Sequence, residues 1–104
     1  MTIFIETQEL LYQNDCVIVP GFGAFILKSH SAYIEGSVFY PPKKTVSFNS
    51  MLNENDGLLV KHVSRKRDIS YKDSLRFIKE EVDAFQTKLF KSGSVEIEKL
   101  GVFQ

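Results

Sequence analysis

A nine-residue pattern near the start of the chain returns in altered form near its end. Val17–Phe25 reads VIVPGFGAF, and Val95–Phe103 reads VEIEKLGVF. Each copy has β-branched residues, then a glycine, and a Phe two residues after that glycine. This order is typical of a β-hairpin, because β-branched residues favour strands and glycine permits the turn. The sequence therefore predicts two related units, residues 1–58 and 59–104, of which the second is cut off within its hairpin.

Length and composition indicate one ordinary domain, or two small halves that share a core. The chain has 104 residues, of which 43% are hydrophobic, enough for a packed interior. No apolar run approaches the ~20 residues of a membrane span, and the first residues lack the basic start of a signal peptide. The single cysteine, Cys16, stands at the head of an apolar run and is expected to be buried. We expect a cytoplasmic domain without an internal disulfide.

Charge is distributed unevenly along a chain whose net charge is zero. Residues 1–58 carry three lysines and six acids, and the remaining ten bases and seven acids fall in residues 59–104. The halves therefore carry −3 and +3. Overall neutrality argues against a strongly basic nucleic-acid binder. Either the two halves attract each other, or the second half faces an anion.

The first half reads as a helix followed by a hairpin with an arm. The expected elements are a helix over residues 2–13, strands over 16–19 and 24–28 around a turn at 20–23, a polar arm over 29–37, and extended segments over 38–40 and 45–48. Pro41 and Pro42 are expected to interrupt the return strand of this arm, because proline cannot donate to a ladder.

The second half reads as helices followed by the second hairpin. Asn49 or Ser50 is expected to cap a helical turn at 51–52, and Asp56 a helix over 57–63. A polar, basic connector follows over 64–68, and Ser70 with Asp73 resembles a capping box. Apolar residues then recur every three or four positions, which predicts one long amphipathic helix: Tyr71, Leu75, Ile78, Val82, Phe85 and Leu89. The fold class is α+β.

Several short sequence motifs make the chain similar to a divergent bacterial family with two tandem HU-type units, within the HU/IHF superfamily of DNA-bending proteins. The motifs are Asp15–Gly23 (DCVIVPGFG), Tyr40–Lys43 (YPPK), Ser47–Asn49 (SFN) and Asn55–Leu59 (NDGLL). The resemblance implies short helices and one long helix packed on an antiparallel hairpin sheet with a shortened arm. It also implies paired units, either as a homodimer or as a pseudo-dimer within one chain. In that family the domain often precedes a membrane segment and a peptidoglycan-binding domain, so this chain would be the N-terminal part or a short member.

The resemblance implies association with double-stranded DNA. Family members that bend DNA use a basic arm with an apolar wedge at its tip. Here residues 29–37 hold no Lys, Arg or Pro, so we expect weak, non-specific binding. The candidate DNA-binding residues are Lys28, Lys43, Lys44, Arg65, Lys66, Arg67 and Lys72. For the cluster in residues 65–72 the alternative to DNA binding is that these residues are a solvated loop with charges at the helix ends.

A second function is a protein adaptor or dimerisation module derived from HU. Its candidate contact residues are Tyr33, Ile34, Phe39 and Tyr40, in and around the arm. The alternative for these side chains is that they cover the core beneath the arm. The strand edge of the second hairpin could also accept an added strand.

Catalysis is not expected. His30 and His62 are the only histidines, and no acid stands at triad or metal-ligand spacing from them. The sequence predicts no catalytic residue, metal, cofactor, small-molecule substrate or membrane contact for this segment.

Overall fold

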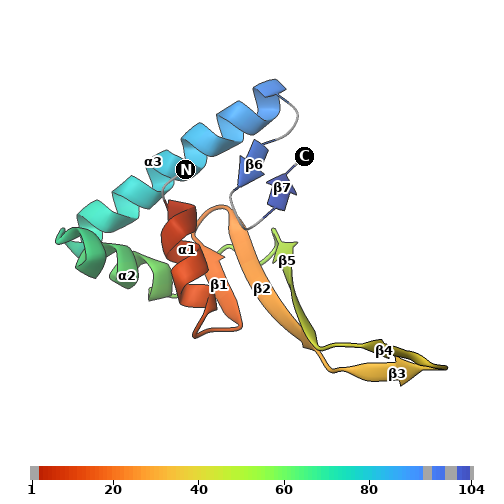
Figure 1. The fold of residues 1–104 in the computed structure, drawn as a ribbon. Coiled ribbons are helices and arrows are strands. Elements are labelled where there is room, and N and C mark those ends of the chain that lie inside the picture. The colour runs from red at the N-terminus through yellow and green to blue at the C-terminus, as the bar shows by residue number, and fades with distance from the viewer. Residues whose placement is uncertain (1–2, 93–94, 98–100, 104) are drawn as a thin grey trace.

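The structure is a computed structural model that describes the backbone of residues 3–92, 95–97 and 101–103 and the side chains of residues 3–88. It is an α+β fold, as predicted (Figure 1). The elements follow the order α1 (Ile3–Leu11), β1 (Cys16–Val19), β2 (Gly23–His30), β3 (Tyr33–Glu35), β4 (Val38–Tyr40), β5 (Lys43–Asn49), α2 (Leu58–Arg67), α3 (Tyr71–Ser92), β6 (Val95–Ile97) and β7 (Gly101–Phe103).

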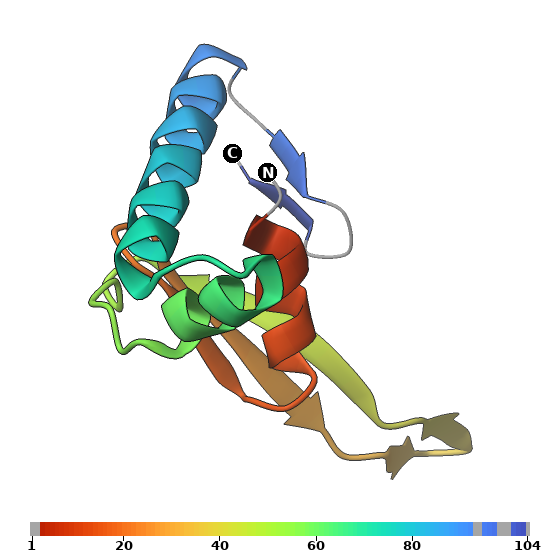
Figure 2. The ribbon, with the colours of Figure 1, turned by 90° about the vertical axis from the view of Figure 1, so that its left-hand side faces the viewer.

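The central sheet has three antiparallel strands in the order β1-β2-β5. Val17 pairs with Phe25 and Val19 with Gly23, while Phe25 pairs on its other side with Phe48. Because successive side chains alternate between faces, these residues share the face that the helices cover. Figure 2 shows α1 and α2 in front of this sheet.

An arm extends the sheet away from the helices (Figure 1). β2 and β5 form its base, and β3 and β4 form a separate two-stranded ladder at its end. Pro41 and Pro42 lie between β4 and β5, as predicted, where they interrupt the return strand. The arm gives the chain its elongated shape of 54 × 32 × 22 Å.

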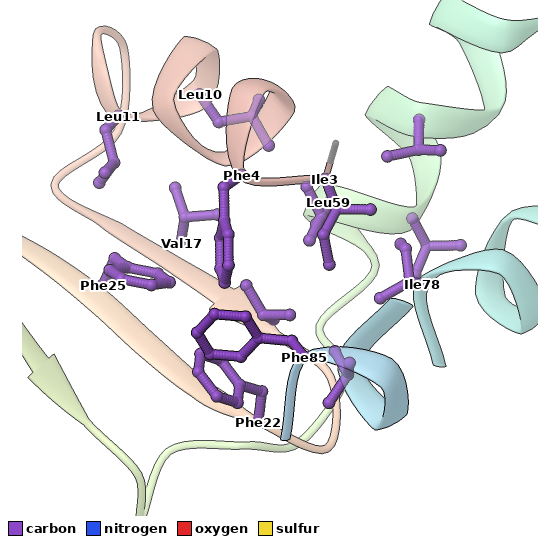
Figure 3. Packing of buried hydrophobic residues seen from close by; sticks show 14 residues of the cluster. Ile3, Phe4, Leu10, Leu11, Val17, Phe22, Phe25, Leu59, Ile78 and Phe85 are labelled. Atoms are coloured by element: carbon purple, nitrogen blue, oxygen red, sulfur yellow. The ribbon is translucent and has the colours of Figure 1, made fainter. Parts of the chain in front are cut away.

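One hydrophobic core joins the two halves of the chain (Figure 3). From the first half, Phe4 and Phe22 contribute rings, and from the second half Phe85 packs edge-on against both, at centroid distances of 5.2 and 5.4 Å. Ile78 is fully buried in the same cluster. The sheet of the first half is therefore covered in part by helices of the second half.

The long helix forms where its apolar stripe predicts it. The Ser70 hydroxyl accepts a hydrogen bond from the Asp73 N–H at 3.1 Å, which is half of a capping box. Ile78, Val82 and Phe85 are buried, whereas Tyr71 at the head of the stripe is 42% exposed. The side chain of Leu89 lies outside the described residues.

Three predictions of helix boundaries and caps are wrong. The segment 64–68 is not a connector, because α2 continues to Arg67 and ends at Asp68, whose φ of 54° is left-handed and whose N–H donates to the Ser64 carbonyl. The N-cap of α2 is Gly57 rather than Asp56, although the Asp56 carboxylate accepts from the Leu58 N–H at 3.1 Å. Residues 50–51 form a turn without helix, in which the Asn49 side chain accepts from the Met51 N–H.

Cys16 is exposed, contrary to the prediction. It pairs with Ile26, one position out of phase with the buried pair Val17 and Phe25. Its side chain therefore belongs to the sheet face opposite the helices. β1 is also an edge strand, so its first residue has a neighbouring strand on one side alone.

Candidate functional site

The base of the arm carries three of the predicted DNA-binding lysines. Lys28 lies on β2, opposite Thr45, while Lys43 and Lys44 lie on β5, opposite His30 and Ser29. Directly paired side chains share a face, so Lys28 and Lys43 lie with His30 on one face and Lys44 on the other. The His30 Nε2 is 3.0 Å from the Thr45 Oγ1, which fits this assignment.

These lysines are exposed, and among the described residues none of the three forms an ion pair. Residues 23–49, which form β2, the arm and β5, hold these three lysines and one acid, Glu35. The net charge of this segment is therefore +2. An anionic partner could therefore bind these ammonium groups without breaking an ion pair within the chain.

The end of the arm is apolar on both faces. Tyr33 pairs with Tyr40, and their rings stack at 4.6 Å with 10° between the planes. Ile34 pairs with Phe39 on the opposite face, and these side chains are 72% and 63% exposed. The alternative that the four residues cover the core beneath the arm is therefore wrong. That they bind a partner stays a prediction.

The second predicted cluster lies at the end of α2 and is partly occupied. The Lys66 Nζ is 2.8 Å from the Glu9 Oε1, and Arg67 donates from Nε and Nη2 to the Glu6 Oε1 at 3.1 and 2.9 Å. Both acids belong to α1. The opposite charges of the two halves therefore meet here, in ion pairs between the first helix and the second.

Glu9 is the centre of a small charge network. Its Oε1 also lies 3.2 Å from the His62 Nε2. The hydrogen bond from Lys66, followed by that from His62, lowers the pKa of Glu9 below its ordinary value of 4.5. The carboxylate is therefore charged at neutral pH and holds both basic groups against α1.

Arg65 and Lys72 remain exposed near the α2–α3 corner. The start of α3 does not present a simple anion site. The Asp73 N–H is taken by Ser70, and the exposed Asp73 carboxylate pairs with Arg76 at 2.8 Å. A carboxylate in the first turn stabilises the helix but repels an incoming phosphate.

The structure does not bring the two predicted clusters together. Figure 1 shows the arm and the α2–α3 corner at opposite ends of the molecule. A hollow of about 250 Å³ lies at the second cluster, lined by Ile5, Glu6, Lys66 and Arg67. The roles of all seven basic residues in DNA binding stay predictions. The three arm lysines are exposed and form no ion pair among the described residues, whereas Lys66 and Arg67 of the second cluster are paired with acids of α1.

Sequence reasoning missed Glu6 and Glu9 as partners of the basic cluster. Glu6 is 1% exposed, and its Oε2 has no hydrogen-bond partner within the described part of the chain. Its partner Arg67 is 61 residues away, a separation with no local spacing signal. The opposite charges of the two halves were the one hint available from the sequence.

Two further observations concern the residues that the structure describes. None of their His, Cys, Asp and Glu side chains form a group of three or more that could hold a metal ion. Among them no helix has both the length and the apolar character that crossing a membrane requires.

Comparison with known proteins gives two family matches in tandem. The profile described as CCDC81-like prokaryotic HU domain 1 matches residues 3–56, and the profile described as CCDC81-like prokaryotic HU domain 2 matches residues 57–104. No curated protein and no solved structure matches the chain significantly.

Proposed function

Because the chain belongs to the CCDC81-like prokaryotic HU family, with two tandem HU-type units, we propose that it is a DNA-associated architectural domain that contacts the duplex with its arm. We assign it no catalytic activity and place it in the cytoplasm. The observation that carries the proposal is the arm itself, which combines three exposed lysines at its base with an exposed apolar end.

The lysines supply the electrostatic part of binding. Lys28, Lys43 and Lys44 can each neutralise a backbone phosphate and release its counterion. Three such contacts give a slope of about −3 for log K against log salt concentration, so binding is weak, non-specific and strongly salt-dependent. Lys28 and Lys43 share a face with His30, and we assign the phosphate contacts first to this face.

The arm end supplies the shape-dependent part. Apolar side chains that enter the minor groove can partly unstack a base step and bend the duplex. Ile34 and Phe39 are directly paired and more than half exposed, which supports a role for them as such a wedge. The prolines stand further back, between β4 and β5, and are not at the tip.

Fluorescence anisotropy with a labelled duplex of about 30 base pairs at ~50 mM salt tests the electrostatic part. The Lys28→Glu, Lys43→Glu double variant should weaken binding at least about tenfold and flatten the salt slope by about 2. The Arg65→Glu, Lys72→Glu variant is the matched control, with the same charge change at exposed residues of the other cluster. Absence of binding by the unaltered chain, or an equal loss in the control, would refute the assignment to the arm.

The aromatic arm end also favours a second candidate, a protein adaptor or dimerisation module. Tyr33, Ile34, Phe39 and Tyr40 form an exposed apolar surface with Glu35 as the one acid in its strands. In this case Ile34→Asp should abolish self-association or partner binding and leave the salt-dependent part of DNA binding unchanged. Lys66 is unsuitable for such tests, because it pairs with Glu9.

Pairing of the two units within one chain is part of the first proposal. One core contains buried residues from both units, so a single chain can bury its own helices. Light scattering should give a monomer mass, whereas a tight dimer at low micromolar concentration would contradict the intramolecular pairing.

A further inference from the structure

His30 is the last residue of β2 and lies next to two of the arm lysines on one face of the arm base. It pairs directly with Lys43 on β5, and Lys28 precedes it by two positions on the same face. Directly paired residues have Cβ atoms about 5 Å apart, and alternate residues of a strand are about 7 Å apart. All three side chains are exposed. One phosphate group on this face is therefore within reach of the imidazole and of both ammonium groups.

The imidazole of His30 is oriented by a contact within the arm. Its Nε2 lies 3.0 Å from the Thr45 Oγ1. The Thr45 hydroxyl can accept a hydrogen bond from Nε2–H, and no described residue is a partner of Nδ1. A protonated imidazole has two N–H donors, whereas the neutral ring has one. The protonated form can therefore keep its contact with Thr45 and offer Nδ1–H to a phosphate oxygen.

The charged groups that face His30 are basic. Lys28 faces it from its own strand, and Lys43 faces it from β5, the strand that pairs with this part of β2. Lys44 belongs to the opposite face. Among the described residues no carboxylate forms an ion pair with any of these side chains.

The acids of the neighbouring segments lie elsewhere. Glu35 belongs to the separate β3–β4 ladder at the end of the arm. The backbone carbonyl of Asp15, before β1, accepts from the N–H of Leu27, whose side chain lies on the opposite face from His30. A phosphate that binds here thus brings the opposite charge that favours the charged form of the ring.

We propose that Lys28, His30 and Lys43 form one phosphate site on the arm base, and that binding of a DNA phosphate in this site is coupled to protonation of His30. The inference rests on the proposed contact between arm and duplex and adds a titratable residue to it. Histidine changes its charge between about pH 5 and 8. Because binding takes up a proton, the affinity for DNA rises as the pH falls through this range.

Fluorescence anisotropy with the labelled duplex of about 30 base pairs, at about pH 8 and about pH 6, tests the coupling. The unaltered chain should bind about three- to tenfold more tightly at the lower pH, the range expected when one group becomes protonated on binding. The slope of log K against log salt concentration should also steepen by about 1, because the imidazolium neutralises one more phosphate charge.

Two substitutions of His30 separate its charge from its shape. His30→Gln keeps a donor for Thr45 but does not titrate, so it should lose most of the gain at the lower pH. His30→Arg is charged at both pH values and should bind more tightly than the unaltered chain at about pH 8, with little further gain at about pH 6. His62→Gln is the matched control, because it removes the histidine beside Glu9 on the other side of the molecule, and it should keep the full gain. Circular dichroism at both pH values reports whether each variant is folded.

Equal affinity of the unaltered chain at the two pH values, or a full gain in His30→Gln, would overturn the coupling and leave the contact between arm and DNA in place. If the duplex does not bind at either pH, the proposed function fails, and NMR titration of the imidazole signals with and without inorganic pyrophosphate decides the phosphate site. Pyrophosphate should move the titration midpoint of His30 to higher pH, and by more than that of His62. A midpoint of His30 that pyrophosphate leaves unchanged would overturn the site.

Discussion

The guanidinium of Arg67 donates two hydrogen bonds to one oxygen of Glu6, from Nε at 3.1 Å and from Nη2 at 2.9 Å. The same guanidinium lies over the Phe77 ring, 4.5 Å from its centroid. Because Glu6 is buried on α1 and Phe77 lies on α3, Arg67 joins three helices. This ion pair is one of the polar links between the two units, beside those of Glu9 with Lys66 and His62.

Arg67→Met should destabilise the chain by about 3 kcal/mol, because it leaves the Glu6 carboxylate buried without its partner. Glu6→Leu combined with Arg67→Met should recover most of this loss, since the pair then becomes apolar. Urea unfolding with an unchanged m-value measures both. If the double variant is as unstable as the single one, packing of the Arg67 stem rather than the charge pair is the source of the loss.

Glu9 should contribute to the acid sensitivity of the fold. Its folded pKa is lowered from 4.5, so its stabilising effect is fully present above about pH 4.5 and is lost as pH falls through the lower folded value. Glu9 and Lys66 are both partly exposed, which limits the effect to about 1 kcal/mol or less. Melting temperatures between about pH 3 and 7 should fall less steeply for Glu9→Gln than for the unaltered chain. Parallel curves would show that the network adds nothing to stability.

Gly23→Ala should destabilise the chain by about 2 kcal/mol, because the new methyl group overlaps both the Phe48 ring and the Asn49 carbonyl. A smaller side chain can replace the Phe48 ring, whereas the Asn49 carbonyl belongs to the backbone and remains in every variant. In a Phe48→Leu background the additional cost of Gly23→Ala should therefore be smaller, though not zero. Chemical denaturation of the four proteins of this cycle provides the coupling energy. A coupling of zero would contradict the ring-over-glycine contact.

Residues 1–56 alone should not fold, although one family profile matches most of them. Their sheet would lose Leu59, Ile78 and Phe85, which are buried in the shared core. Circular dichroism and NMR dispersion of this fragment should indicate a largely unfolded chain. Addition of the fragment 57–104 should restore native signals. A cooperative thermal transition of the first fragment by itself would contradict the shared core.

The elements with strong local signals were predictable from the sequence. The stripe Ile78, Val82 and Phe85 predicted α3 because helical periodicity and burial agree there. Both hairpins were predicted from glycine and from β-branched residues in the two copies. Pro41 and Pro42 predicted the break in the return strand, because the lack of an N–H is a property of the residue itself.

The errors arose where local sequence allows two outcomes. Cys16 begins a run of four apolar residues, so alternation could not show which of them face outward. Arg65, Lys66 and Arg67 read as a polar connector, yet arginine and lysine are good helix formers, and a single left-handed residue, Asp68, ends the helix.

The exposure of Phe39 and the pairing of Arg67 with Glu6 depend on contacts between distant segments. Phe39 is exposed because β4 pairs with β3 in a separate two-stranded ladder at the end of the arm, away from the core. Glu6 and Arg67 come from helices far apart in the chain. Composition could suggest that the halves attract each other but could not name the pair.

The gap in the arm ladder has a mechanical consequence. The two ladders keep the same register, but residues 31–32 on one strand and 41–42 on the other belong to neither ladder. A rotation of the β3–β4 hairpin about this gap breaks no ladder hydrogen bond and disturbs no buried side chain. The arm end can therefore swivel to follow a curved surface while its base stays fixed to the body of the molecule.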